Sequence, residues 1–252
     1  MDIVHLLLVI GVFVLAGAVK GITGMGLPTV AMSMLGLWMS PMQAVALLVA
    51  PSLATNLAQC RGPHLRPLAI RLWRGWVAIA IVTVVAPGLG GATASVETAR
   101  NLLGGTLIAY GAWGLWRPVL PDLAGRSRWL GTVAGAATGV VTAFTGVFVL
   151  PWVPYLQSLR LDKDEMVQAL GLSFTVATLA LAVRVHASAP WWPPSTALGV
   201  CVALAGAFGG LKLGEVLRAN LAGPAFQKAL FLVFIALGLA NLVRTGSPAL
   251  EL

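Results

Sequence analysis

The stretch LAGAVKGITGMGLP, residues 15–28, interrupts an apolar run with a lysine, four glycines and a proline. An unbroken helix would not tolerate so many glycines followed by a proline. Gly21, Gly24 and Gly26 allow the chain to leave one helix and a ligand to approach the bare backbone. Pro28 suits the first turn of a new helix, because its missing amide hydrogen is not needed there. The stretch therefore predicts two helices that meet at a break.

The composition of the whole chain indicates which solvent surrounds this break. Of the 252 residues, 58 % are apolar and only 10 % are charged, whereas about 25 % charged residues is usual for a soluble domain. Long runs such as 76–91 and 225–242 contain almost no ionisable groups. In a bilayer, such runs satisfy their backbone polar groups only as helices. The sequence therefore predicts an all-α polytopic membrane protein with no appended soluble domain.

Glycines, prolines and charges divide the chain into ten apolar segments. Several of them are shorter than the ~20 residues that a full crossing requires. The first two segments, and likewise the sixth and seventh, meet at breaks rich in glycine or threonine, so each pair is expected to form a broken or re-entrant hairpin. The ten predicted segments are 3–19, 22–39, 41–59, 75–92, 99–116, 129–145, 146–159, 166–185, 196–214 and 224–243.

An internal repeat groups these segments into two halves. The motif Ala-Gly-x-x-x-Gly at 16–21 recurs at 134–139. Because each half then has five segments, an odd number, the two copies are expected to be inverted relative to each other. Inverted repeats with broken helices at corresponding positions are the build of many secondary transporters, and the breaks mark the substrate site. We expect a first repeat over 1–120 and a second over 121–252, each a hairpin followed by three spanning helices in one membrane domain.

Positive charges predict the orientation of the chain, because Lys and Arg collect in loops that stay cytoplasmic. The net charge is +8, and arginines cluster at 60–74 and 117–128. Placing both loops in the cytoplasm puts both termini outside and leaves only Arg100, Arg184 and Arg244 on the outer side. Nucleic acid, the other usual partner of a basic chain, is not expected.

Lys20 adds a full positive charge beside the first break. Free amides at a helix start form an anion site, and a charge within so much apolar sequence indicates a functional position. Alternatively, Lys20 extends to the membrane interface and the glycines only allow helices to pack closely. Its counterpart in the repeat, Thr138, carries no charge. The candidate anion-binding residues here are Lys20, Gly21, Thr23, Gly24, Gly26 and Pro28.

The mirrored stretch GVVTAFTGVFVLP, residues 139–151, carries Thr142, Thr145 and Gly146 at its break. Hydroxyl groups and bare backbone can hydrogen-bond the oxygens of a sulfonate, sulfite or carboxylate without adding charge. The alternative is that the two threonines bond back to their own helix.

A polar stripe marks the third segment, where Ser52, Asn56 and Gln59 fall at i, i+4 and i+7 on one helix face. Such a stripe either lines a path or holds helices together. Asn56 is the strongest single candidate, because a buried amide needs partners. The corresponding part of the second half supplies the hydroxyl groups of Ser173, Thr175 and Thr178.

Acidic residues and metal ligands are missing from these segments. Asp and Glu all lie near predicted segment ends, the three histidines are scattered, and the two cysteines are isolated. We therefore expect no carboxylate proton relay, no metal site and no cofactor. Hydroxyls, amides and one lysine suit an anion better than a cation. Proton coupling stays open, since the anion itself can carry a proton.

At these residues the chain resembles the TauE/SafE sulfite exporter family of integral membrane transporters. The resemblance rests on A-G-x-x-K-G-x-T-G-x-G-x-P at 16–28, P-S-L-A-T-N-x-x-Q at 51–59 and G-x-x-T-x-x-T-G-x-x-x-x-P at 139–151. It covers nearly the whole chain. It implies a multi-pass carrier of the bacterial inner membrane for small sulfur-containing anions such as sulfite or organosulfonates. In such a membrane the charge pattern makes both termini periplasmic.

We therefore predict a secondary transporter that works by alternating access, and not an enzyme. An anion channel could use the same lining residues. An intramembrane enzyme would need buried carboxylates, a histidine nucleophile or paired cysteines, which the sequence does not offer. The expected partners are the small anionic substrate and membrane lipid. Small residues at 205–210 would also permit contact with a second copy of the chain.

Overall fold

The protein is represented by a computed structural model that describes residues 3–89, 95–116, 120–123, 127–188, 194–221 and 223–243. Within these residues the regular elements are all α-helices, and each predicted apolar segment overlaps one of them. The helices are α1 (Ile3–Thr23), α2 (Leu27–Leu35), α3 (Pro41–Gln59), α4 (Leu65–Leu89), α5 (Val96–Trp116), α6 (Ser127–Thr145), α7 (Trp152–Ser158), α8 (Lys163–Ser188), α9 (Pro194–Leu221) and α10 (Pro224–Val243).

The predicted all-helical membrane class is confirmed. In the described part of the chain, six helices are long and apolar enough to cross a membrane, judged by length and composition: α1, α3, α4, α8, α9 and α10. The helix α5 has 21 residues, as many as α1, but it is less apolar because its first turns carry Glu97, Arg100 and Asn101. The chain is a multi-span membrane protein.

Two helices are much shorter than the segments predicted for them. The helix α2 has nine residues and α7 has seven, so at a rise of 1.5 Å per residue each covers less than half of a bilayer core about 30 Å thick. The predicted segments 22–39 and 146–159 were too long because each included the break itself. Each hairpin therefore joins one long helix to one short helix that does not cross.

The helix α4 begins earlier than predicted. It starts at Leu65, so Arg66, Arg71 and Arg74 lie on its first turns and not in a loop. Pro67 does not prevent this start, because the first amides of a helix have no intrahelical partner. Arg117, Arg126, Arg244 and the chain ends, which carry much of the predicted orientation, lie outside the described residues.

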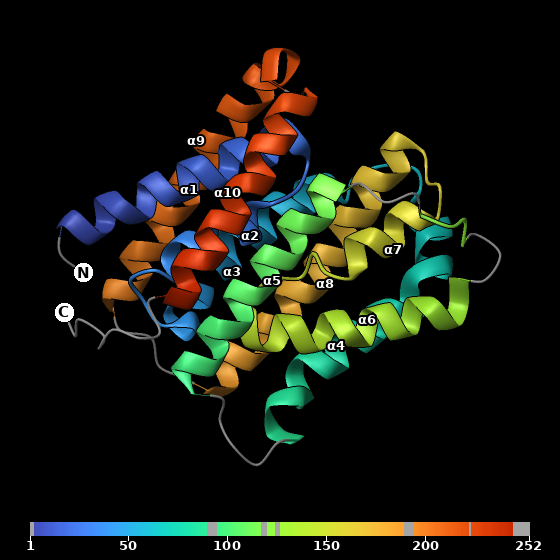
Figure 1. The fold of residues 1–252 in the computed structure, drawn as a ribbon, viewed down its shortest axis with the longest axis horizontal. Helices are drawn as coiled ribbons and strands as arrows, with labels where there is room; N and C mark the ends of the chain where they lie inside the picture. The colour runs from blue at the N-terminus through green and yellow to red at the C-terminus, as the bar shows by residue number, and fades with distance from the viewer. Residues whose placement is uncertain are drawn as a thin grey trace.

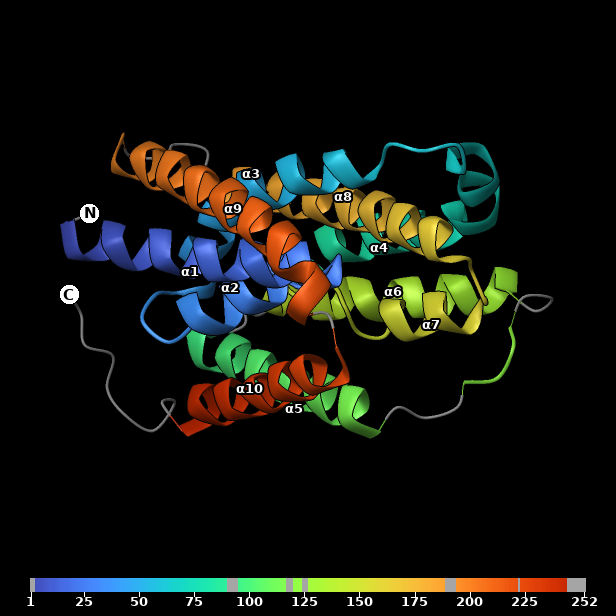
Figure 2. The same ribbon diagram turned by 90° about the horizontal axis from the view of Figure 1, so that it is seen from above.

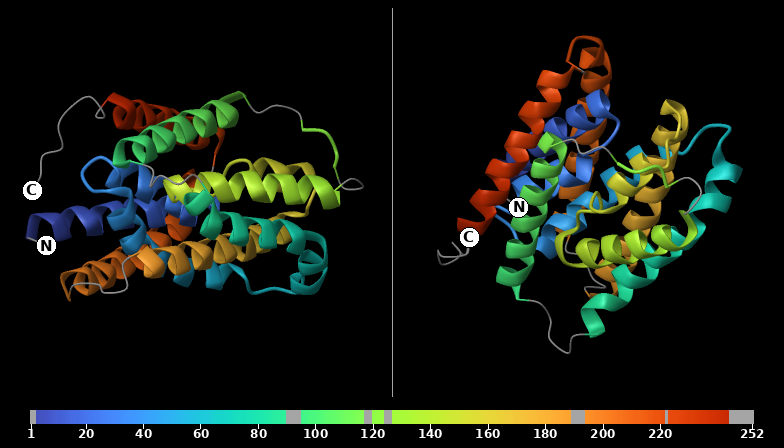
Figure 3. Two further views of the ribbon diagram at one scale, coloured as in Figure 1. Left: turned by 90° about the horizontal axis from the view of Figure 1, so that it is seen from below. Right: turned by 45° about the vertical axis from the view of Figure 1, so that its right-hand side comes forward.

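Helices from opposite halves pack side by side in pairs. The helix α1 runs along α9, α4 along α6, α5 along α10, and α3 along α8 (Figure 1). Seen from above, α5 and α10 form one edge of the bundle, while α3 and α8 lie toward the other (Figure 2). The view from below shows the same two edges (Figure 3). The short helix α2 lies inside this arrangement, and most of its side chains are buried.

Glycines bring the paired helices close together. Gly17 and Gly21 of α1 face the backbone of α9, and Gly135 and Gly139 of α6 face α4, with no space for a larger side chain. The expectation that Gly21 helps the chain to leave the helix is therefore wrong, since α1 continues to Thr23. Such small-residue contacts are a usual means of helix association in membranes.

The small residues at 205–210 make contacts within the chain. Gly206 faces Ile10, and Gly210 faces Val14, both on α1. These two positions therefore serve the α1–α9 pair and not a second copy of the chain.

Candidate functional site

The first break forms a tight turn between α1 and α2. Gly24 and Gly26 have φ angles of 81° and 101°, in the left-handed region that glycine adopts without strain. The Thr23 hydroxyl stabilises this turn, donating to Met25 O at 2.7 Å and accepting from Met25 N at 3.2 Å. Pro28 lies in the first turn of α2, as predicted.

Lys20 lies one turn before the break and is only 1 % exposed. Its Nζ donates to Thr55 Oγ1 at 3.1 Å and to Asn56 Oδ1. Among the described residues, no carboxylate lies within 4.0 Å of this ammonium group. The alternative in which Lys20 extends to the membrane interface is therefore excluded. Burying an isolated ammonium group in a protein interior costs several kcal/mol. A buried lysine at this position therefore indicates a functional role.

A directed chain of hydrogen bonds runs away from Lys20 through α3 to α8. Asn56 turns its oxygen to the ammonium group, and its Nδ2 donates to Ser52 Oγ at 3.2 Å. The Ser52 and Thr178 hydroxyl oxygens are 3.1 Å apart. Thr178 uses its own proton on Phe174 O, 2.6 Å away, so Ser52 is the donor between the two hydroxyls. Each donor in the chain polarises the next, and the acceptor ends are directed toward Lys20.

Thr55 belongs to this cluster, although sequence analysis missed it. Its hydroxyl donates to Pro51 O at 2.8 Å, which leaves its oxygen to accept from Lys20. Thr55 follows Ser52 by three residues, and positions three apart share a helix face. The spacing rule that selected Asn56 could therefore have identified it. The cluster of Lys20, Ser52, Thr55, Asn56 and Thr178 is called the lysine cluster below, and its five side chains are buried.

Two further polar groups belong to the first break. Gln59 Nε2 donates to Gly24 O at 2.7 Å and ties the end of α3 to the turn. Thr29, in the first turn of α2, is buried, and its hydroxyl has no hydrogen-bond partner in the part of the chain that the structure describes. A buried polar group without a partner indicates water or a ligand that completes the site.

Ser173 and Thr175 lie on α8 but outside the lysine cluster. Ser173 Oγ accepts from Trp76 Nε1 at 2.8 Å, and Thr175 Oγ1 lies 3.4 Å from Cys60 Sγ. These hydroxyl groups connect α8 to α4 and to the residue that follows α3. Of the three predicted hydroxyls on α8, only that of Thr178 meets Asn56.

The second break repeats the turn of the first. Gly146 has a φ angle of 68°, and the Thr145 hydroxyl accepts from Val147 N at 3.1 Å while donating to a carbonyl of its own helix. Thr142 donates to Thr138 O at 2.7 Å. The two threonines therefore bond back to α6, which was the alternative considered for them.

A second cation, Arg184, lies near the second break. It was not selected as a site residue in the sequence analysis. It is half-buried on α8 and donates to Ala143 O. It lines a cavity of about 450 Å³ together with Phe144 and Gly146 of the second break. Arg184 lies within the predicted apolar segment 166–185, so the argument applied to Lys20 would have identified it.

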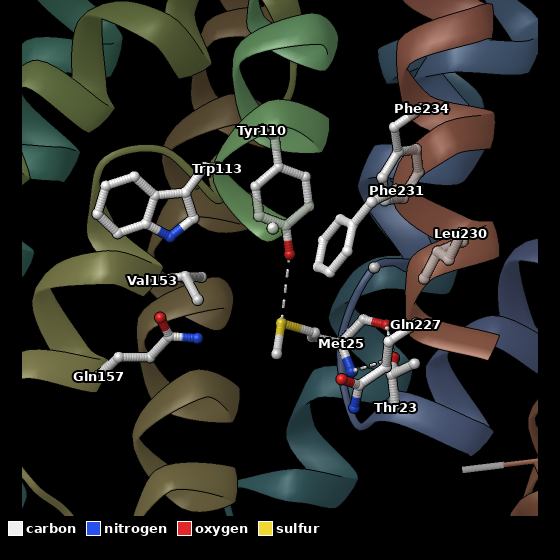
Figure 4. Close-up of a pocket in the computed structure, with 12 residues that line it drawn as sticks. Thr23, Met25, Tyr110, Trp113, Val153, Gln157, Gln227, Leu230, Phe231 and Phe234 are labelled. Carbon is white, nitrogen blue, oxygen red and sulfur yellow. Dashed lines mark hydrogen bonds between the residues drawn. The ribbon is translucent and has the colours of Figure 1, made fainter. Parts of the chain in front are cut away.

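A separate cavity of about 320 Å³ lies against the first break, where Thr23 and Met25 face it (Figure 4). The two cavities lie beside different parts of α5, since the cavity at the first break is lined by Tyr110 and the cavity at the second break by Ala99. Eleven residues along a helix correspond to roughly 16 Å. Each break therefore has its own cavity, and the two cavities are well separated along the bundle.

Comparison with known proteins gives one match. The sequence profile described as Sulfite exporter TauE/SafE matches residues 9–241, which include both breaks and the whole lysine cluster. Neither curated proteins nor solved structures give a match. The match covers most of the chain and agrees with the multi-span helical fold. The chain belongs to the TauE/SafE sulfite exporter family of membrane transport proteins.

Proposed function

We propose that the protein is a secondary transporter that carries a small sulfur-containing anion, sulfite or an organosulfonate, by alternating access through the lysine cluster. The observation that carries this proposal is the buried ammonium group of Lys20 with no carboxylate beside it among the described residues. Lys20 has three N–H donors, and two of them are directed to Thr55 and Asn56. The third donor is then available to an anion oxygen, and a charge-assisted bond of this kind is strong.

The start of α2 adds neutral donors to the proposed site. The first hydrogen bond into this helix is from Val30 N to Gly26 O at 2.9 Å, so earlier amides of α2 are not used within the helix. The positive end of a helix dipole favours an anion. The buried Thr29 hydroxyl can donate in the same region. Gly24, Gly26 and Pro28 shape this helix start, which is the role we assign to them.

The remaining candidates have supporting roles in this proposal. Ser52, Asn56 and Thr178 hold and polarise the lysine side chain, and Gln59 holds the turn. Thr145 and Gly146 shape the second break, which forms the other end of the pathway, and Thr142 bonds back within α6. Ser173 and Thr175 position α8.

The packing of the helices supports two inverted repeats over 1–120 and 121–252. Exchanging the halves maps α1 onto α6 and α9 onto α4, so the α1–α9 pair becomes the α6–α4 pair. The pairs α3–α8 and α5–α10 map onto themselves. Two cavities, one at each break, share no lining residue in the described part of the chain, which suits a carrier that opens to one side at a time better than a continuous channel.

The location and energy source follow from the charge pattern and the substrate. We place the protein in the bacterial inner membrane with both termini periplasmic. The α1–α2 hairpin then enters and leaves on the periplasmic side, and α3 crosses to bring Arg61 and the basic start of α4 to the cytoplasm. No catalytic role is proposed. A proton carried on the anion itself would couple transport without a buried carboxylate.

Transport by the purified protein in lipid vesicles tests the proposal. We expect saturable uptake of sulfite or methanesulfonate that is stimulated by the same anion inside. Lys20→Ala should abolish this uptake, whereas the matched variant Thr142→Ala should keep it, with both proteins inserted and monodisperse. A conductance that does not saturate would assign a channel, and unchanged uptake by Lys20→Ala would remove the assigned site.

A further inference from the structure

A third cavity lies where four of the apolar spanning helices have an end on the same side of the bundle. It holds about 480 Å³ and is lined from the end of α3, the connection to α4, the start of α8 and the end of α9. The candidate spans of α3 and α9 end at these residues, and those of α4 and α8 begin there. Because the ends of spanning helices lie at the boundary between hydrocarbon and water, this cavity lies at the level of the lipid headgroups.

Positive charge gathers in this cavity, which is called the basic pocket below. Arg61 lines it from the connection between α3 and α4, Lys163 from the start of α8 and Arg218 from the last turn of α9. In the part of the chain that the structure describes, none of the three forms an ion pair with a carboxylate. Asp164 is the one acidic residue among the described lining residues. Three like charges against one opposite charge repel one another, so the basic pocket favours an anionic ligand.

The position of Lys163 is not explained by the stability of its own helix. The first turn of a helix favours negative side chains, and Asp164 and Glu165 suit that place. Lys163, the first residue of α8, opposes the helix dipole. Glu165 does not balance this charge, because its Oε1 lies 3.6 Å from His64 Nδ1. An anion in the basic pocket would give Lys163 a partner.

A single glutamine holds the loop that carries Arg61. The side chain of Gln168 is buried, and its Nε2 donates to Cys60 O at 2.8 Å and to Gly62 O at 3.1 Å. Its Oε1 accepts from His64 N at 3.0 Å. The backbone on both sides of Arg61 is therefore fixed before a ligand arrives, which lowers the entropy cost of binding.

The spanning helices expose apolar side chains next to the basic pocket. Leu57, Leu65 and Val216 are 51 %, 52 % and 76 % exposed, and each lies within four residues of Arg61 or Arg218. A ligand with an anionic head and apolar chains can contact both the pocket and this surface. Basic pockets between membrane helices are a usual binding site for anionic lipid headgroups. A soluble anion would use only the pocket.

We propose that the basic pocket binds the phosphate group of an anionic phospholipid from the adjacent leaflet. The phosphate oxygens accept hydrogen bonds from the guanidinium groups of Arg61 and Arg218 and from Lys163 Nζ, and such charge-assisted bonds are strong. Gln59 also lines the pocket, and its Nε2 donates to Gly24 O in the first break. A bound headgroup therefore steadies the end of α3 that holds this turn.

Native mass spectrometry of the delipidated protein, titrated with lipid, tests this inference. The probes are phosphatidylglycerol, phosphatidylcholine with the same acyl chains, and glycerol 3-phosphate. We expect one phosphatidylglycerol per chain to bind about tenfold more tightly than phosphatidylcholine, which has no net charge. Arg61→Gln and Arg218→Gln should each weaken phosphatidylglycerol binding about fivefold, and the double variant about 25-fold.

Lys228→Gln is the matched control, since Lys228 is exposed at the start of α10 and is not among the described lining residues of the basic pocket. It removes the same charge and should stay within about twofold of the natural protein. Equal weakening by Lys228→Gln and Arg61→Gln, or equal affinities for the two lipids, would overturn the inference. Competition by glycerol 3-phosphate at the concentration of the lipid would also overturn it, since the pocket would then serve a soluble phosphate.

Thermal unfolding provides a second readout that does not depend on lipid counting. Without lipid, the double variant of Arg61 and Arg218 should unfold at the midpoint of the natural protein, because both side chains are exposed. Phosphatidylglycerol should raise the midpoint of the natural protein and of Lys228→Gln but not that of the double variant. Lys20→Ala should keep the full rise, which separates the basic pocket from the proposed anion site. Loss of the rise in Lys20→Ala would show that the lipid binds at the lysine cluster and would overturn the inference.

Discussion

The breaks after α1 and after α6 end in the same turn but stand in different surroundings. In both, a threonine accepts the amide of the residue two positions on, and the glycine that follows it has a positive φ angle. Beside the first break, Lys20 supplies a charge from within α1, whereas beside the second, Arg184 reaches in from α8. The two breaks thus share a backbone turn, but the positive charge beside each break comes from a different helix.

The two halves also differ in register. Gly21 packs against α9 three residues before Gly24, but Gly139 packs against α4 seven residues before Gly146. The helix α6 therefore has about one extra turn between its packing surface and its break. When the packing glycines Gly21 and Gly139 are aligned, the counterpart of Lys20 is Thr138. When the turn glycines Gly24 and Gly146 are aligned, it is Thr142.

Making the first break resemble the second should change transport the most. Lys20→Thr should reduce the initial rate of sulfonate exchange about 100-fold, because it removes the buried charge that would pair with the anion. Adding Thr142→Lys should not restore the rate, since Thr142 faces its own helix and not Asn56. Exchange in vesicles measures both variants. Recovery of half the activity in the double variant would show that the two breaks are interchangeable.

The glycines of the two breaks should differ in their tolerance of a methyl group. Both Gly24→Ala and Gly146→Ala force a left-handed backbone, which costs about 1–2 kcal/mol. At Gly146 the new Cβ would also lie 2.9 Å from Met32 and Val45, whereas at Gly24 nothing lies within 4 Å. We expect Gly146→Ala to be less stable by a further ~1–3 kcal/mol. Thermal unfolding in detergent measures this, and equal midpoints would contradict the described packing.

Removing a hydroxyl group should matter more near the first break. Thr55→Val leaves one donor of Lys20 without its acceptor and should slow exchange about tenfold, the effect of one unsatisfied buried group. Thr142→Val removes only a bond within α6 and should stay within about twofold of the natural protein. The ratio of the two rates is the relevant measurement. A ratio near one would mean that the lysine cluster has no special role.

Arg184→Gln should give the smallest effect and the most informative one. Because Arg184 lines the second cavity and is not among the described lining residues of the first, we expect the half-saturating concentration to rise about threefold on one side of the membrane, as for a partly exposed charge. The other side should be unaffected. Vesicles of opposite orientation separate the two values, with His186→Gln on the same helix as control. Equal changes on both sides would place Arg184 in a shared pathway.

Much of the fold could be predicted because membrane helices are recognised by their apolar composition and by the glycines, prolines and charges that interrupt it. The apolar runs identified the helices, and Gly24, Gly26 and Pro28 identified the first break. The extent of α4 could not be predicted, because Arg66, Arg71 and Arg74 resemble a loop until the helix is seen to continue through them. The lengths of α2 and α7 depend on where their breaks end.

The site could be predicted only in part, because residue spacing shows which side chains share a helix face but not what that face contacts. The spacing of Ser52 and Asn56 indicated one helix face, but spacing cannot show which helix that face meets. Only the fold brings Thr178 of α8 to Ser52 and separates Ser173 from it. Gly21 was misassigned because a glycine in a helix pair and a glycine in a turn look alike in sequence.

Equilibrium binding measures whether Lys20 holds the anion. Purified protein and its Lys20→Ala and Thr142→Ala variants would be titrated calorimetrically with methanesulfonate, acetate and sodium chloride. We predict saturable methanesulfonate binding that Lys20→Ala abolishes and Thr142→Ala retains. Methanesulfonate binding that is the same in all three proteins would contradict the account and would leave Lys20 as a buried residue of helix packing.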